Sequence, residues 1–159
     1  MLEDPLIHPH QPLTTPAGEE VNVDIGMVPV IERLWKIGLR TTACCQDVGE
    51  ATRSVRDGRH PSPLAYSGDG FIAYHDGYAL LKMPREDAQT LADLVARMPA
   101  FAEAISDRWG PEGWRMNVPL LHDDGVTHLG TDAWIHFPNV QIPTLTTALD
   151  TVLAQVPPT

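Results

Sequence analysis

The segment Thr41-Thr-Ala-Cys-Cys-Gln-Asp47 holds the residues best suited to chemistry. It places a thiol at the end of a predicted strand, just before the N-terminus of a short predicted helix, and the positive end of a helix stabilises a thiolate. Successive strand residues face opposite sides. We therefore expect Cys44 to pack in the core and Cys45, followed by Gln46, to be the reactive thiol. The alternative is that both cysteines are buried as small hydrophobic residues.

Two histidines are the expected partners of this thiol. His75 ends a predicted strand, and His136 lies within the strand segment Trp-Ile-His-Phe. Strand alternation places Trp134 and His136 on one face of a sheet, opposite the face that would carry the core. A cluster of Cys45, His75 and His136 could serve as a nucleophile with its base, or as three metal ligands with one open position. Both interpretations stay open, and we assign no metal.

Two further groups have residue types suited to binding. His8 and His10 are two apart in a proline-rich stretch and could chelate a metal, although two solvated histidines are commoner in such a segment. Arg53, Arg56 and Arg59 follow the thiol segment in a chain with few basic residues, and guanidinium groups grip carboxylate or phosphate. The alternative is that these three arginines form ion pairs with surface carboxylates and bind no ligand.

The expected ligand-binding residues are Gln46, Arg53, Arg56 and Trp134, around an anionic small molecule. The sequence contains no CxxC pair, HExxH, P-loop or GxGxxG element. It therefore does not specify a cofactor.

The elements that must position these residues follow from hydrophobic periodicity. We expect a helix after Asp24, which would be its N-cap, ending at Gly38. Its buried stripe is Met27, Val30, Ile31, Leu34 and Trp35. A strand over 40–45 and a short helix over 48–57 follow.

The second half of the chain predicts a hairpin, three helices and two strands. Phe71–His75 and Tyr78–Met83 flank Asp76-Gly77, a pair suited to a type I′ turn. The remaining expected elements are a helix over 85–98, a short helix over 101–109, strands over 114–121 and 131–137, and a final helix capped by Asn139.

This order indicates an α+β fold in two layers, a mainly antiparallel sheet with helices packed on one face. Four prolines fall within the first sixteen residues, so residues 1–20 form a proline-rich extended arm and residues 21–159 a single domain. The other sheet face is expected to be partly open.

Composition limits the partners. The 21 acidic and 11 basic residues give a net charge of −10, which repels phosphate backbones and anionic lipids. We therefore expect no nucleic acid and no membrane among its partners. The two cysteines are adjacent, so an ordinary disulfide is excluded and a cytoplasmic location is favoured.

The run Val23-Asp-Ile-Gly-Met-Val-Pro-Val-Ile-Glu-Arg-Leu-Trp35, with Gly38 and Thr41-Thr-Ala-Cys-Cys-Gln46, resembles small uncharacterised bacterial and phage proteins. These have a Leu-Trp helix, then Gly, then Thr-x-x-Ser-Cys-Gln. The same region is faintly similar to wybutosine-synthesis methyltransferases, which continue with Ser-Gly-Arg where this chain has Gln46-Asp47. The net charge argues against the tRNA substrate that this second resemblance implies.

These observations favour a small-molecule-binding domain, with a Cys45-centred site that acts on an anionic molecule by thiol or metal-assisted chemistry. The alternative function is a non-catalytic interaction module that uses the open sheet face. A homo-oligomer or a protein partner is compatible with either.

Overall fold

The computed structural model describes residues 8–58, 69–101 and 113–155, and it has the expected α+β fold. The helices are α1 (Val28–Ile37), α2 (Val48–Arg56), α3 (Asp69–His75), α4 (Arg85–Ala96) and α5 (Ile142–Gln155). The strands are β1 (His10–Thr14), β2 (Glu20–Asp24), β3 (Ala43–Cys45), β4 (Tyr78–Pro84), β5 (Arg115–Asn117), β6 (Leu120–Asp123), β7 (Val126–Leu129) and β8 (Asp132–Pro138).

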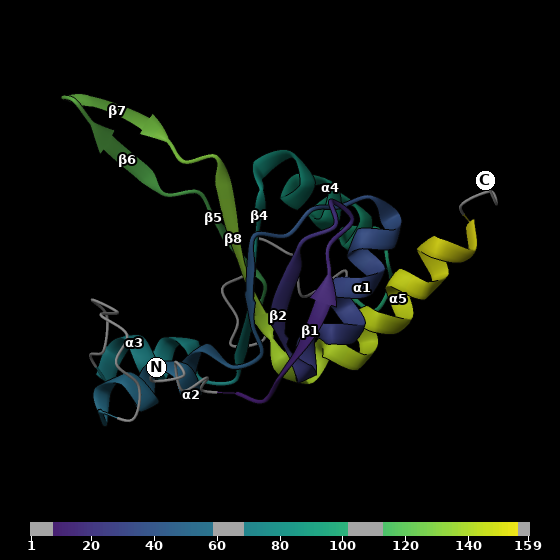
Figure 1. Cartoon of the computed structure of the whole chain (residues 1–159), viewed down its shortest axis with the longest axis horizontal. Coiled ribbons are helices and arrows are strands. Elements are labelled where there is room, and N and C mark those ends of the chain that lie inside the picture. Colours follow the sequence, from purple (N-terminus) through teal and green to yellow (C-terminus); the bar gives the residue numbers. More distant parts are fainter. Residues whose placement is uncertain (1–7, 59–68, 102–112, 156–159) are drawn as a thin grey trace.

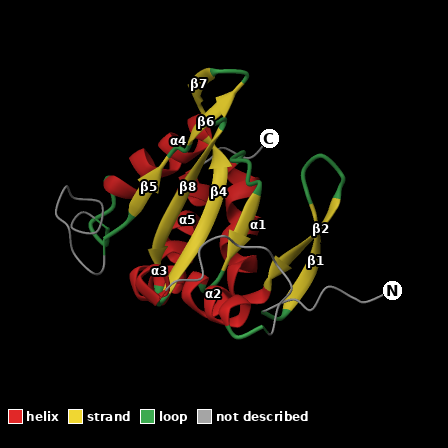
Figure 2. Ribbon diagram, turned by 90° about the vertical axis from the view of Figure 1, so that its left-hand side faces the viewer, coloured by secondary structure: helices red, strands yellow, loops and turns green. Residues whose placement is uncertain are grey.

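A four-stranded antiparallel sheet with the order β3-β4-β8-β5 forms the centre of the molecule. Helices α1, α4 and α5 lie behind it in Figure 2, whereas α2 and α3 lie at one end. The inward residues of β4 and β8 meet the apolar stripes of the helices. The core contains Met27, Val30, Ile31, Leu34, Ala79, Leu81, Met83, Leu91, Ile135, Phe137, Leu145 and Leu149.

The predicted first helix is confirmed, apart from its start and its cap. A 3₁₀ turn over Ile25–Met27 precedes α1, and Gly38 ends the helix with a left-handed φ of 95°. Asp24 makes no side-chain cap hydrogen bond. Its carboxylate instead takes part in the site described below. None of the helices in the described ranges is long and apolar enough to cross a membrane.

The predicted strand over Phe71–His75 is wrong, and so is the hairpin that depends on it. These residues belong to α3, with Ile72 and His75 buried one turn apart. Phe, Ile and Tyr favour strands only weakly, and packing decides between the two structures. Here α3 packs against α2, and the turn at Gly77 (φ 72°) leads directly into β4.

Two other segments also differ from the expectation. Part of the predicted proline-rich arm is strand β1, which pairs with β2 in a separate two-stranded sheet, where Pro12 is tolerated because each strand has a free edge. The predicted strand over 114–121 is divided into β5 and β6 around Val118 and Pro119. The predicted helix over 101–109 lies outside the described residues, except for Phe101 in the core.

The hairpin β6–β7 leaves the sheet as a projecting ribbon. It extends from the β5 and β8 end of the sheet, away from the remaining elements (Figure 1). Asp124 and Gly125 form its two-residue turn with φ values of 49° and 78°, which is the type I′ pattern. Every residue of both strands is exposed.

Gly49 fixes the distance between α2 and the turn after α3. A Cβ atom at Gly49 would lie 2.7 Å from the Asp76 Cα atom, a backbone atom that cannot move away easily. Gly70, in α3, has open space at the same position. We expect Gly49→Ala to lower the free energy of unfolding by about 1–3 kcal/mol through overpacking, despite the better helix propensity of alanine.

Gly70→Ala is the matched control, and we expect it to be neutral or slightly stabilising. Urea denaturation of both variants checks the prediction. Equal stability of the two variants would contradict it.

Candidate functional site

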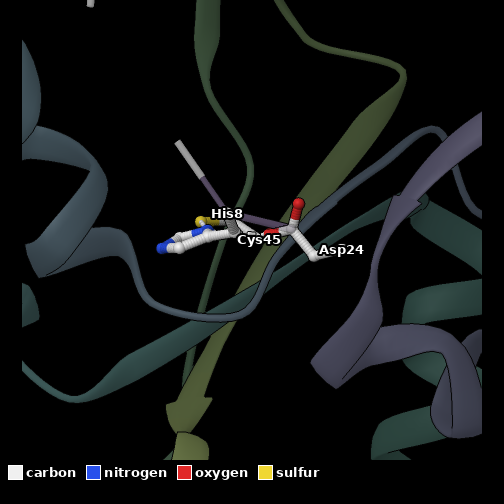
Figure 3. A group of neighbouring side chains, drawn as sticks. All are labelled: His8, Asp24 and Cys45. Carbon is white, nitrogen blue, oxygen red and sulfur yellow. Dashed lines mark hydrogen bonds and ion pairs between the residues drawn. The ribbon is translucent and has the colours of Figure 1, made fainter. Parts of the chain in front are cut away.

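Three side chains from separate segments converge at one edge of the sheet. His8 precedes β1, Asp24 ends β2 and Cys45 ends β3, and Figure 3 shows the three side chains pointing toward one another. The His8 Nδ1 atom lies 3.0 Å from Asp24 Oδ2 and 3.8 Å from Cys45 Sγ. The three ligand atoms lie within 4.8 Å of one another. Nitrogen, oxygen and sulfur donors thus face a common point.

Gln46 holds Asp24 in this position. The Gln46 backbone N–H donates to Asp24 Oδ2 at 2.9 Å, and the Gln46 side-chain oxygen accepts from the Gly26 N–H at 2.8 Å. A Cβ atom at Gly26 would approach that oxygen to 2.7 Å. These two bonds join the end of β2 to the end of β3, so Gln46 is a positioning residue here.

His8 is buried between acidic groups. Its exposed fraction is only 4 %, and Glu50 Oε2 lies 3.3 Å from Nε2 without the geometry of a hydrogen bond. The hydrogen bond to Asp24 and the contact with Cys45 raise the pKa of His8 to about 10, against the opposing effect of burial. With a pKa this far above neutrality the His8 ring is an imidazolium at pH 7, so it does not act as a base there.

The two cysteines are in different environments, as the strand alternation predicts. Cys44 packs against the core, and burial raises its pKa to about 12. Cys45 lies on the other face, opposite Leu80 of β4, and contacts His8. Both thiols are free.

His75 and His136 meet each other instead of Cys45. Their rings stack with centroids 4.4 Å apart, and both residues are buried. Register places Cys45 opposite Leu80, and Leu80 opposite His136. His136 is therefore on the same sheet face as Cys45 but two strands away, with Leu80 between them. The predicted cluster of Cys45, His75 and His136 is therefore wrong. Cys45 lies with His8 and Asp24, and the two predicted histidines form a separate pair.

Arg115 completes the histidine group from the edge strand β5. It lies opposite His136, and its guanidinium stands 3.8 Å from the Tyr74 ring and 4.0 Å from the Tyr78 ring. It also donates to the Tyr74 carbonyl oxygen at 2.6 Å. The row Cys45, Leu80, His136, Arg115 thus crosses the whole sheet on one face.

The predicted arginine group is engaged with carboxylates. Arg53 pairs with Asp76, and Arg56 pairs with Asp57 and Asp69. Arg59 lies outside the described residues. The predicted ligand residue Trp134 is exposed on the same face as His136, with the Lys82 ammonium 5.5 Å from the centre of its ring.

Sequence reasoning missed His8 and Asp24 as partners of Cys45. His8 was paired with His10, which is exposed in the structure, and Asp24 was assigned to a helix cap. The signal available was weak, because only the folding of β1 onto β2 brings residue 8 beside residue 24. No protein-family model matches the chain, and neither a curated protein nor a solved structure matches it.

The buried histidine pair predicts sensitivity to acid. Burial, with the nearby His75 and Arg115, lowers the pKa of His136 to about 4. Between pH 6.5 and 4 the unfolded chain binds a proton that the folded chain does not bind, so stability falls as the pH falls through this range. We expect His136 to account for a loss of about 3 kcal/mol in the free energy of unfolding.

Urea denaturation at pH 7, 5.5 and 4 tests this expectation. His136→Gln should lose less stability over that range than the wild type does. The exposed control His122→Gln should follow the wild type. Identical pH dependence in all three proteins would show that His136 does not contribute.

The environments of the two thiols predict their order of reaction. With EDTA present at pH 7.5, a thiol reagent should label Cys45 first, because Cys44 is packed in the core with a raised pKa. Mass spectrometry of peptides at partial labelling gives the order. Equal labelling of both thiols in the folded protein would contradict the assignment.

Proposed function

We propose that this protein binds one zinc-class divalent metal ion through His8, Asp24 and Cys45, and uses the remaining coordination position on an anionic small molecule. The observation that carries the proposal is the convergence of three different ligand atoms within 4.8 Å. A thiolate, an imidazole and a carboxylate together suit zinc and exclude magnesium and calcium, which prefer oxygen alone.

The distances support coordination geometry. Ligand bonds of about 2.0–2.3 Å in a tetrahedral arrangement separate neighbouring donor atoms by about 3.3–3.6 Å. The His8–Asp24 and His8–Cys45 separations of 3.0 and 3.8 Å lie on either side of this range. Small side-chain movements are enough to bring all three atoms to one ion.

The contacts on the imidazole favour a metal over thiol catalysis. In a catalytic triad, the histidine is the base, and the nucleophile and the orienting carboxylate contact opposite nitrogens of its ring. Here Asp24 and Cys45 share Nδ1, and Asp24 is the nearer. Glu50 stands at Nε2, where an outer carboxylate commonly orients a metal-bound histidine.

Three protein ligands leave one position for water or substrate, as in catalytic zinc sites. A metal at that place would supply Lewis-acid polarisation or an activated water. Across Leu80, His136 and Arg115 offer polar groups on the same face, about two and three strand spacings from Cys45, or ~10 and ~14 Å. This row supports a substrate whose anionic end lies toward Arg115. Because Cys45 acts as a thiolate ligand, we also propose a reducing, cytoplasmic setting.

Metal titration tests the site. The protein, stripped with EDTA under reductant, should bind one equivalent of Co²⁺ with the near-ultraviolet charge-transfer absorption of a thiolate ligand. Cys45→Ser should abolish that absorption, and His8→Ala and Asp24→Asn should each weaken binding by at least about tenfold. The Co²⁺ visible bands should also change when inorganic phosphate enters the open position.

His10→Ala is the matched control for His8→Ala, because His10 is an exposed histidine two residues away. It should bind cobalt as the wild type does. Far-ultraviolet circular dichroism of each variant verifies that the fold is retained. Cobalt binding that is unaffected by Cys45→Ser would overturn the proposal.

A further inference from the structure

The ribbon β6–β7 exposes apolar side chains that its own sheet does not cover. Leu120, Val126 and Leu129 are 62, 63 and 51 % exposed, and every other residue of the two strands is exposed as well. An isolated two-stranded hairpin is marginally stable in water. A further strand along one edge would stabilise it.

Turn geometry determines which backbone groups face outward along β7. In a two-residue turn the flanking residues Asp123 and Val126 are hydrogen-bonded to each other, so alternation directs the amides of Thr127 and Leu129 away from β6. The Gly130 N–H donates to the Pro119 carbonyl on the inner side, in agreement with this alternation.

The same outer edge is already paired further along the chain. The Arg85 N–H donates to the Thr131 carbonyl at 3.0 Å, where β4 ends and α4 begins. Beyond this point, at Leu129 and Thr127, no described strand continues the line of β4. A strand from outside the chain fits there as a continuation of β4.

The two edges of the ribbon differ in their protection. Along β6, Asp123 carries a charge, which discourages edge pairing. Along β7 the sequence Val-Thr-His-Leu has no proline, aspartate, glutamate, lysine or arginine. A chain with a net charge of −10 repels its own copies over most surfaces, and this edge is one place where that repulsion is weak.

From these observations we infer that β7 pairs with β7 of a second copy of this chain, in antiparallel orientation about a two-fold axis. The axis passes through Thr127, so Thr127 pairs with Thr127 of the second copy and Val126 lies opposite His128. In this register the turn of the second copy lies beside Leu129. It therefore does not reach Thr131, where the Arg85 N–H is already bound. The contact is small, so we expect a weak dimer that dissociates on dilution.

Two proline variants test the edge directly, because proline removes the outward N–H without disturbing the inner ladder. Thr127→Pro acts on the β7 edge, and His122→Pro acts on the equivalent outward position of β6. Both lose the same side-chain hydrogen bond between His122 and Thr127. Sedimentation velocity from ~5 to ~500 μM should show a monomer–dimer equilibrium for the wild type and for His122→Pro, and a monomer throughout for Thr127→Pro.

Amide hydrogen exchange in the wild type provides a second measurement that needs no variant. Exchange at Thr127 should slow at least about threefold between 5 and 500 μM, whereas exchange at His122 should not change. A monomeric wild type, a Thr127→Pro variant that still dimerises, or equal loss of the dimer in both variants would overturn the inference. None of these results depends on metal binding at His8, Asp24 and Cys45.

Discussion

The register of β4 between β3 and β8 is the constraint on which the other features depend. It directs Ala79, Leu81 and Met83 toward the helices and Leu80 and Lys82 toward the opposite face. Because side chains alternate with a period of two, a slip of one residue would exchange the two faces completely. The buried helix contacts therefore also fix the row that runs from Cys45 to Arg115.

The acidic character of the chain has different consequences at long and short range. Over the chain as a whole, the net charge of −10 is the reason why we expect no polyanionic partner. At the end of β3, two of the acidic residues, Asp24 and Glu50, lie beside the His8 imidazole, which also contacts the Cys45 thiol. Removing a carboxylate from water is costly unless it is paired, and the partly buried Asp24 is paired with both His8 and the Gln46 backbone amide. The space between Asp24, Glu50 and Cys45 is therefore suited to a positive charge, which either a proton on His8 or a metal ion would supply.

Local patterns predicted those parts of the fold where one periodicity dominates. Four patterns of this kind allow one interpretation each. They are the helical stripe from Met27 to Leu34, the left-handed Gly38, the capping spacing of Asp47 and Glu50, and the alternation in β8. The segment Phe71–His75 was misjudged because its residues favour strands while its packing against α2 favours a helix. The histidine partner of Cys45 was misjudged for a related reason. His8 is separated from it by 37 residues, and only the β1–β2 hairpin brings the two together.

The position of β3 in the sheet order also affects how the chain emerges during synthesis. β3 is made early, yet β4, its partner in the sheet among the described strands, is completed roughly 40 residues later. At about 5–20 residues per second, β4 emerges from the ribosome roughly 2–8 s after Cys44 and Cys45 do. During this interval the nascent chain presents two neighbouring thiols to oxidants and to free metal ions. Protection of the growing chain, by a chaperone or by a well-reduced cell interior, thus matters more for this protein than its small size suggests.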